Sequence, residues 1–334
     1  MLRILIVGLA GVIFSSAAQA ADSRICWLNL DKGTAPTTLT VAEQTIYISA
    51  DAASGTTTSI ADFYSPSTTS FIRYEYCNPG TPYGKRTENL SGVASSDKIY
   101  PTNIPGIGVK LWFNNATAEG AFPSDAKLSF ADNKPGLFSV FPGSHYHIQF
   151  FKTSDRLRLK DPLGDTVLEP NEYGYNWLST PLASSYFLKL YIDKIKIIST
   201  PACTPDSAKN IDFDTVTPSL LKNGVERDLD FAITCKSDYG HYTARASITT
   251  NTPSSDASTI RVADASGNKD KLAIQITDSN GKAMKLDGTT SEQRSSTSQG
   301  PAEYSWKARL IAGAKPAPAE GVFTAKAEII FDIE

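Results

Sequence analysis

Apolar and polar residues alternate along the last segment of the chain, which reads GVFTAKAEIIFDIE. The apolar positions are Phe323, Ala325, Ala327, Ile329, Phe331 and Ile333. This period of two predicts a β-strand over 321–333 with one buried face. No turn or further strand follows it, so we expect the free edge of this strand to need a partner.

Similar short runs recur along the whole chain, while helical periodicity is scarce. They are rich in Val, Ile, Thr, Tyr and Phe and are separated by Gly, Pro, Asn, Asp and Ser clusters, as is typical of strands and turns. The predicted strands lie at 45–50, 71–77, 108–113, 146–151, 186–198, 228–235, 242–250, 271–277 and 304–312. Asn280-Gly281 and Asp287-Gly288 indicate hairpin turns. The segment 217–224 holds a single helical turn or a loop, and 290–303 is a polar loop. The pattern predicts an all-β protein built from β-sandwiches.

Residues 1–20 have the features of a signal peptide. Arg3 supplies a positive charge, residues 5–14 form an apolar core too short to cross a bilayer, and Ala18 and Ala20 are small residues at the cleavage site. We expect the mature chain to begin at Ala21 and to lie outside the cytoplasm without membrane insertion. The net charge of −3 and the lack of a Lys/Arg cluster give no reason to expect nucleic acid binding.

An exported chain favours disulfides, and this one has four cysteines. Four cysteines allow three connectivities. One local bridge in each half is the simplest, and it pairs Cys26 with Cys77 and Cys203 with Cys235. Zinc binding by the thiolates is the alternative, but the chain has no C-x-x-C pair.

The segment IISTPACT, residues 197–204, marks the expected domain boundary. A long predicted strand ends there, a short stiff Ser-Thr-Pro link follows, and the second cysteine pair begins at once. We expect one domain over 21–200 and a second over 201–334.

The second domain ends on its best-patterned strand. Its predicted strands lie near 210–216, 227–235, 242–250, 259–263, 271–277, 303–312 and 321–333. An immunoglobulin-type sandwich needs at least about seven sound strands with the last pairing with the first, and 259–263 is short. We therefore expect a groove that a strand from another protein fills through main-chain hydrogen bonds and alternate apolar side chains. The alternative is an ordinary closed β-domain with its own edge strand.

At this point the second domain resembles the pilin domain of chaperone–usher fimbriae. The matching features are Cys203 with Cys235, the segment KLAIQITDSNGKAMKL and the terminal GVFTAKAEIIFDIE, in which Gly321 stands fourteen residues from the end. The penultimate residue is Ile333, where the family has an aromatic residue. The resemblance implies an incomplete immunoglobulin-like domain. It also implies that a periplasmic pilus chaperone supplies the missing strand, that an outer-membrane usher assembles the fibre and that the next fimbrial subunit replaces the chaperone.

The first domain stands where a simple pilin carries its donor extension. This architecture is similar to that of two-domain fimbrial tip adhesins, and the segments NIPGIGVKLWF and YIDKIKIISTPACT also resemble their first domains. The resemblance implies a lectin-like first domain of jelly-roll or immunoglobulin-like type. It places the protein at the fimbrial tip, on the cell surface.

Sugar-binding sites combine planar hydrogen-bonding groups with an apolar wall. The loop CNPGTPY and the segment LEPNEYGYNW offer both kinds of group. The candidate ligand-binding residues are Asn78, Tyr83, Asn171, Tyr173, Tyr175 and Trp177. The alternative for each of them is turn chemistry or a place in the core.

The segment GSHYHIQFF carries two histidines two positions apart. On a strand, one face would carry His145, His147 and Gln149, and the core face would carry Tyr146, Ile148 and Phe150. His145 and His147 could chelate zinc if a third ligand came from Asp155, Glu172 or a partner. Zinc is the only cofactor hypothesis, and its alternative is a solvent-facing strand with two polar histidines.

The leading functional hypothesis is therefore a fimbrial tip adhesin that binds a host or surface glycan or glycoprotein. A second hypothesis is a tip or initiator subunit that starts fibre assembly and binds no sugar. A third is a secreted β-sandwich enzyme, but the chain contains no G-x-S-x-G and no H-E-x-x-H motif.

Overall fold

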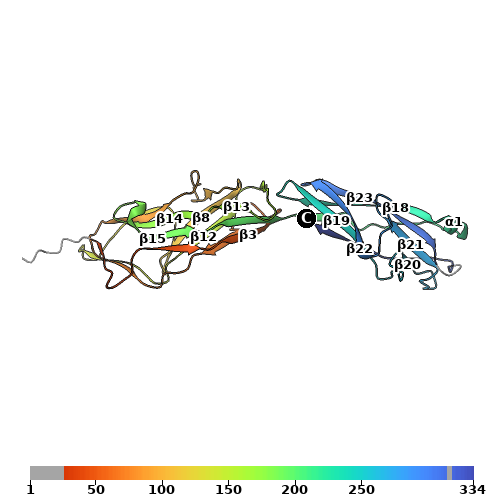
Figure 1. The fold of residues 1–334 in the computed structure, drawn as a ribbon, viewed down its shortest axis with the longest axis horizontal. Helices are drawn as coiled ribbons and strands as arrows, with labels where there is room; N and C mark the ends of the chain where they lie inside the picture. The colour runs from red at the N-terminus through yellow and green to blue at the C-terminus, as the bar shows by residue number, and fades with distance from the viewer. Residues whose placement is uncertain (1–25, 314–317) are drawn as a thin grey trace, which may run out of the picture.

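The computed structural model describes residues 26–313 and 318–334, so the predicted signal peptide lies outside the described residues. Within them the chain is all-β, as predicted, with strands β1 to β24, one six-residue helix and one 3-10 turn. Figure 1 shows two parts arranged end to end along the long axis of the molecule, with the C-terminus beside their junction. The described residues include no helix long and apolar enough to cross a membrane.

The first part contains four sheets. One has the order β1 (Trp27–Leu28), β5 (Ile72–Cys77), β11 (Gly136–Val140). The second runs β10 (Ser124–Lys127), β6 (Pro82–Thr87), β14 (Asn171–Leu178), β15 (Tyr186–Ile192), β2 (Thr37–Val41), with a 3-10 turn at Ala183–Ser185. The third runs β4 (Ala61–Tyr64), β12 (His145–Lys152), β8 (Ile107–Asn114), β7 (Tyr100–Pro101), with β9 (Glu119–Ala121) also beside β8. The fourth runs β13 (Asp165–Leu168), β16 (Ile195–Thr200), β3 (Gln44–Ser49).

The second part is a sandwich of two sheets. The larger runs β17 (Ala202–Pro205), β18 (Val225–Lys236), β23 (Pro301–Ala312), β21 (Leu272–Thr277), β20 (Ile260–Val262). The smaller runs β22 (Asp287–Thr297), β19 (His241–Thr249), β24 (Glu328–Ile333). Helix α1 (Pro218–Asn223) lies at the end far from the junction (Figure 1).

Each part buries its own apolar cluster. The first cluster is formed by residues between Leu39 and Ile197, and the second by residues between Phe213 and Leu310. Both predicted disulfides are present, Cys26–Cys77 in the first part and Cys203–Cys235 in the second. The exact domain boundary at 200/201 stays a prediction.

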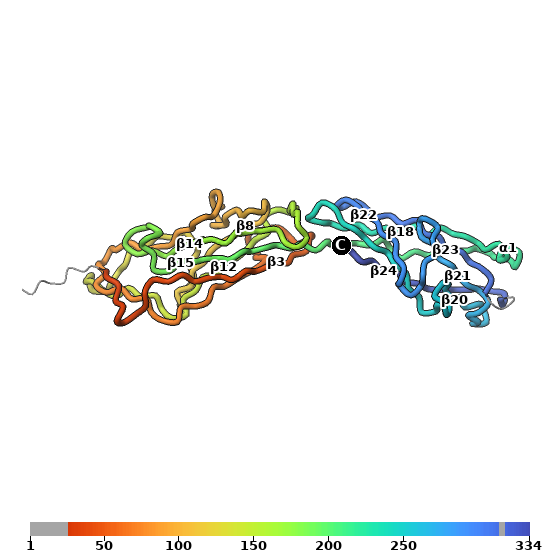
Figure 2. The backbone as a smooth tube through the Cα atoms, viewed as in Figure 1, coloured from red at the N-terminus to blue at the C-terminus, as the bar shows by residue number. Residues whose placement is uncertain are grey.

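The two parts also touch at their junction. The turn between β18 and β19 reaches the first part, where Tyr239 packs against the first cluster and the backbone oxygen of Asp238 accepts a hydrogen bond from the N–H of Leu159 at 3.0 Å. Figure 2 shows β24 running back toward this junction, where the C-terminus lies.

The predicted single strand over 186–198 is wrong, because the chain changes sheets in its middle. Strand β15 pairs in parallel with β2, whereas β16 pairs in parallel with β3. The break falls at Asp193 and Lys194, where the N–H of Asp193 donates to the oxygen of Val41 and the oxygen of Lys194 accepts from Gln44. Strands β15 and β2 therefore belong to one sheet, and β16 and β3 belong to another.

The prediction of a polar loop over 290–303 is also wrong, because this segment contains most of β22 and the start of β23. Ser291, Ser295 and Thr297 are exposed, while Glu292 is buried and accepts a hydrogen bond from the indole Nε1 of Trp306 at 2.6 Å. A buried carboxylate that accepts hydrogen bonds through its Oε2 thus lies on the inner face of this strand, and an apolar pattern does not reveal such a face.

Three other predictions concern the ends of the second part. The segment 210–216 is not a strand, and of 321–333 only Glu328–Ile333 is one. The helical turn near 217–224 is present as α1. Thr217 caps it by accepting from the N–H of Leu220, and Gly224 ends it with a φ of 73°.

Candidate functional site: an open strand edge and two polar surfaces of the first part

Strand β24 has a partner on one edge only. It pairs antiparallel with β19, from Glu328 opposite Thr249 to Ile333 opposite Ala244, and it ends the three-stranded sheet. No strand among the described residues pairs with its other edge. The second part therefore has an unpaired strand edge, which ends beside the junction, where the C-terminus lies.

The hydrogen-bond register shows which residues face this edge. Thr243 and Glu334 exchange both backbone hydrogen bonds, at 2.8 and 2.9 Å. In an antiparallel pair the bonded positions alternate, so Ile330 and Asp332 also bond toward β19. The N–H and C=O groups of Ile329, Phe331 and Ile333 consequently point to the open edge.

The same three residues direct their side chains to the core. Each is only partly buried while it packs against the second cluster. The Phe331 ring lies 5.9 Å from that of Phe231 and 6.0 Å from that of Tyr304, measured between ring centroids. The open edge thus offers main-chain groups and uncovered apolar side chains together, as strand addition requires.

The other predicted groove residues differ from these three. Phe323 is partly buried, with its ring centroid 6.5 Å from that of Phe213, but Ala325 and Ala327 are exposed. All three lie before β24, in the stretch 321–327 that is not a strand. The apolar alternation in the sequence therefore begins at Phe323, before the strand itself begins at Glu328.

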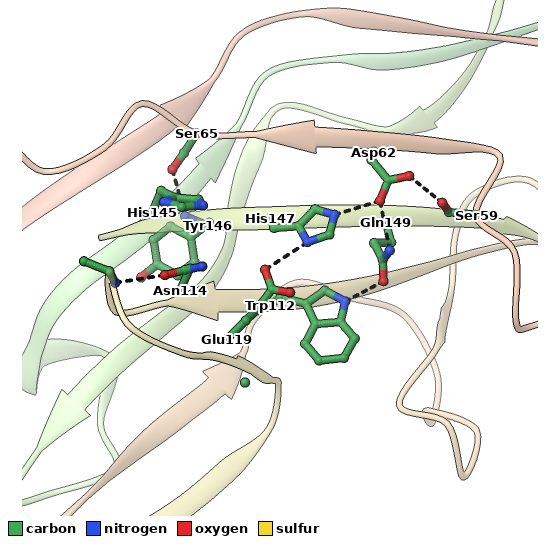
Figure 3. A network of polar contacts seen from close by, with 12 residues as sticks. Ser59, Asp62, Ser65, Trp112, Asn114, Glu119, His145, Tyr146, His147 and Gln149 are labelled. Carbon is green, nitrogen blue, oxygen red and sulfur yellow. Dashed lines mark hydrogen bonds and ion pairs between the residues drawn. The ribbon is translucent and has the colours of Figure 1, made fainter. Parts of the chain in front are cut away.

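A second surface lies on one face of the sheet formed by β4, β12 and β8, and His147 is at its centre (Figure 3). As predicted, Tyr146, Ile148 and Phe150 face the core, with at most 1% of each side chain exposed. His147 points the other way but is also buried, because the Tyr64 ring stacks on it at 4.5 Å.

Two carboxylates hold the two imidazole nitrogens of His147 (Figure 3). Its Nε2 lies 2.7 Å from Oδ1 of Asp62 on β4, and its Nδ1 lies 3.0 Å from Oε1 of Glu119 on β9. A neutral imidazole has one N–H, so only the doubly protonated ring donates to both carboxylates. Burial raises the pKa of Asp62, but hydrogen bonds from Ser59, Gln149 and His147 outweigh it and lower that pKa overall.

The network extends to an indole. Gln149 donates from Nε2 to Oδ1 of Asp62 at 2.9 Å and accepts from the indole N–H of Trp112 at 2.7 Å (Figure 3). Lys110 lies over the Trp112 ring, with Nζ 4.5 Å from its centroid. This face therefore fixes planar polar groups between two aromatic side chains, of which Tyr64 is 56% exposed.

This arrangement offers no third ligand for the zinc site predicted at His145 and His147. His145 Nδ1 lies 2.9 Å from the oxygen of Gly143, and both nitrogens of His147 face carboxylates. Asp155 accepts from Ser54, and Glu172 pairs with Lys189. Among the described residues no three His, Cys, Asp or Glu side chains are grouped to hold a metal ion.

The six predicted ligand-binding residues do not form one site. The Asn78 oxygen accepts from the N–H and the hydroxyl of Thr81 in a turn, and Tyr83 packs on Phe138. Asn171 is exposed on β14 beside Asn89, and Tyr173 is buried with its hydroxyl donating to Glu169. For these four, whose contact with a ligand stays a prediction, the structure gives a turn, core packing or a local contact.

Tyr175 and Trp177 do lie together, on the outer face of the β10–β6–β14 sheet. Asn176 between them points inward and accepts from the hydroxyl of Tyr146, and neither aromatic belongs to the buried cluster. The Trp177 ring crosses Gly84 on β6, where an added Cβ would lie 3.0 Å from the ring and 2.2 Å from the Ser124 oxygen. Any larger residue at position 84 would therefore collide with the Ser124 backbone and crowd the indole.

A hollow of about 440 Å³ opens beside this indole. Its wall is formed by Pro82, Arg86, Asp125, Ala126, Lys127, Trp177 and Pro181. Arg86 holds Asp125 with two hydrogen bonds of 2.5 and 2.9 Å, and the Arg86 guanidinium lies 5.4 Å from the Trp177 ring centroid. The hydrogen bond from Arg86 lowers the pKa of Asp125, and the same bond raises the pKa of Arg86.

Sequence reasoning missed most residues of both surfaces. Trp112 and Lys110 could have been found, because alternation along 108–113 puts them on one outward face of β8. Asp62, Glu119, Arg86 and Asp125 could not, since only the strand pairing brings them beside His147 and Trp177.

A comparison with protein-family models matches residues 194–334 to the family described as fimbrial protein. We refer to residues 194–334 as the fimbrial domain. The match confirms the resemblance to a pilin domain, and the open edge of β24 lies within the matched residues. No curated protein sequence matches the chain.

Several solved structures with a similar course of the chain are adhesins or pilus proteins. The receptor-binding domain of the adhesin MrkD1P from Klebsiella pneumoniae is 20% identical, with 54% of this chain and 97% of that one covered and a TM-score of 0.40. The CupB6 tip adhesin of Pseudomonas aeruginosa is 14% identical, with 85% of this chain and 90% of that one covered and a TM-score of 0.34. The match in the CsuC–CsuE chaperone–tip adhesion subunit complex of Acinetobacter baumannii is 10% identical. It covers 90% of this chain and 99% of that one, with a TM-score of 0.39. Because each score is below 0.5, the assignment of the fimbrial domain rests on the family model.

Proposed function

We propose that this protein is a tip adhesin of chaperone–usher fimbriae, which accepts a strand through its fimbrial domain and binds a glycan receptor through its first part. The observation that carries the proposal is the open edge of β24. There, three alternate residues present unpaired main-chain groups and partly uncovered apolar side chains to the same groove.

The order of events follows from this edge. A periplasmic chaperone covers the groove first, because an exposed apolar strand edge favours aggregation. At the outer-membrane usher, the next fimbrial subunit replaces the chaperone with its own strand. The protein is thereby carried through the periplasm to the cell surface.

The position at the tip is supported by strand β16, which directly precedes the fimbrial domain. A fibre-building pilin donates the segment before its domain. Here that segment is hydrogen-bonded on both sides, by β13 and by β3, inside a sheet of the first part. A strand held on both edges is not free to enter the groove of a neighbour.

Glycan binding is supported by the two polar surfaces of the first part. Both combine an aromatic ring with fixed planar groups, Trp112 with Gln149 on one and Trp177 with Arg86 on the other. Such pairs suit a ligand that offers hydroxyl groups and an apolar C–H face.

The test is a glycan-array screen of the full chain, completed by a donor strand appended after Glu334 so that the groove is filled. We expect binding to a defined glycan, with a heat-denatured sample as the control. A blank array would contradict glycan binding and would favour a tip or initiator subunit that acts only in assembly.

A further inference from the structure

We propose that the hollow beside Trp177 binds a sugar that carries a carboxylate group, such as a uronic or a sialic acid. This inference rests on the proposed glycan-binding function, and it names the class of glycan and the place where it binds. The hollow of about 440 Å³ falls in the usual range of small-ligand sites.

The charges around the hollow favour an anionic ligand. Arg86 and Lys127 are cationic, and Asp125 is the only acidic side chain in the wall. Asp125 is already held by both terminal nitrogens of Arg86. Lys127 is exposed and makes no ion pair within the described part of the chain, so its ammonium group is available to a ligand carboxylate.

The indole of Trp177 supplies a second, independent observation. Only 3% of this side chain is exposed, yet its Nε1–H has no hydrogen-bond partner among the described residues. Buried donors in proteins are nearly always paired. Since Trp177 lines the hollow, a ligand oxygen that enters as the Arg86 side chain shifts would give this donor a partner.

The rest of the wall is apolar and rigid. Pro82, Ala126 and Pro181 flank the indole, and all of them lack hydrogen-bonding side chains. A sugar ring can place its C–H face against such a surface while its carboxylate reaches the rim. An acidic peptide has the charge but lacks a ring face of C–H groups beside its carboxylate, so the hollow fits the sugar better.

Asp125 accepts from the two Arg86 nitrogens that a ligand carboxylate would otherwise use, so the two carboxylates would compete for the guanidinium. The Asp125→Asn variant keeps the size of the side chain and removes its charge. It should free the Arg86 guanidinium and bind an acidic sugar more tightly. A role of Asp125 in folding alone would not improve binding of any ligand.

The experiment measures affinities of the strand-completed full chain for oligosaccharides that end in glucuronic acid, in sialic acid or in a neutral hexose. We expect binding of an acidic oligosaccharide that weakens at least about tenfold in Lys127→Met, strengthens in Asp125→Asn and falls as salt rises. The matched control is Lys134→Met, an exposed lysine outside the hollow, which should change nothing.

The other outcomes separate this inference from the function on which it rests. Binding of a neutral glycan that ignores Lys127 and Asp125 would overturn the inference and leave the adhesin intact. The same follows if an acidic peptide competes as well as the sugar. No glycan binding by any variant would overturn both.

Discussion

The carboxylate of Asp238, in the fimbrial domain, accepts a hydrogen bond from the backbone N–H of Leu157, in the first part, at 3.1 Å. Its second oxygen accepts from the hydroxyl of Ser199 at 2.7 Å. Asp238 is 4% exposed, so one buried acceptor joins the two parts and the segment that connects them. The junction is therefore a packed contact and not a free linker.

We predict that Asp238→Ala loosens this junction. The variant leaves a buried N–H and a buried hydroxyl without their acceptor, which costs about 1–3 kcal/mol. Hydrogen exchange of the Leu157 amide should become faster, and the urea midpoint of the strand-completed chain should fall. Asp230→Ala, at an exposed position of β18, is the control and should leave both values unchanged. Unchanged exchange at Leu157 in Asp238→Ala would contradict the role given to this contact.

Gly84 is predicted to be the most sensitive glycine beside the hollow. A Cβ at this position would lie 2.2 Å from the backbone oxygen of Ser124, which a strand pairing holds in place. Gly84→Ala should therefore lower the free energy of unfolding by about 1–3 kcal/mol. Gly55→Ala is the matched control, because nothing lies within 4 Å of its added Cβ. Equal stability of the two variants would show that the indole and β10 adjust freely.

Lys85 gives a prediction for pH. Burial lowers its pKa from 10.5 to about 8, and its ammonium group donates to the oxygen of Gly120 at 2.7 Å. A lysine with a lowered pKa in the folded state binds fewer protons than in the unfolded state between about pH 8 and 10.5, so the free energy of unfolding rises with pH there. Denaturation of the wild type and of Lys85→Met from pH 7 to 9.5 should show this rise in the wild type relative to the variant. Parallel curves would contradict it.

The two faces of β24 give a matched pair of variants. Phe331 points into the groove, whereas Ile330 is 48% exposed on the opposite face. Phe331→Ala should weaken binding of a separate donor peptide at least about tenfold, because the incoming strand covers this ring. Ile330→Ala should bind the peptide as the wild type does. Equal losses would mean that the strand does not enter through the predicted groove.

The sequence patterns predicted those features that depend on residues near one another in the chain. Alternation identified strands such as β8, β12, β18 and β23 and the core face of 146–150, and the spacing of cysteines identified both disulfides. The patterns failed where pairing with other strands, and not the order of apolar residues, sets the structure. Examples are the break between β15 and β16 and the Ser/Thr-rich β22. Of the candidate site, the terminal strand and two aromatic residues were found. The charged partners were missed because they come from strands distant in sequence.

The open edge of β24 is the central claim, and comparing three chains tests it most directly. One is the chain alone, the second carries an appended strand with alternating apolar residues, and the third carries the same residues in scrambled order. We predict that only the second is a monomer in size-exclusion chromatography with a sharp thermal transition, and that the other two aggregate or are degraded. Equal behaviour of all three chains would contradict the account, because the fimbrial domain would then be complete without a donated strand.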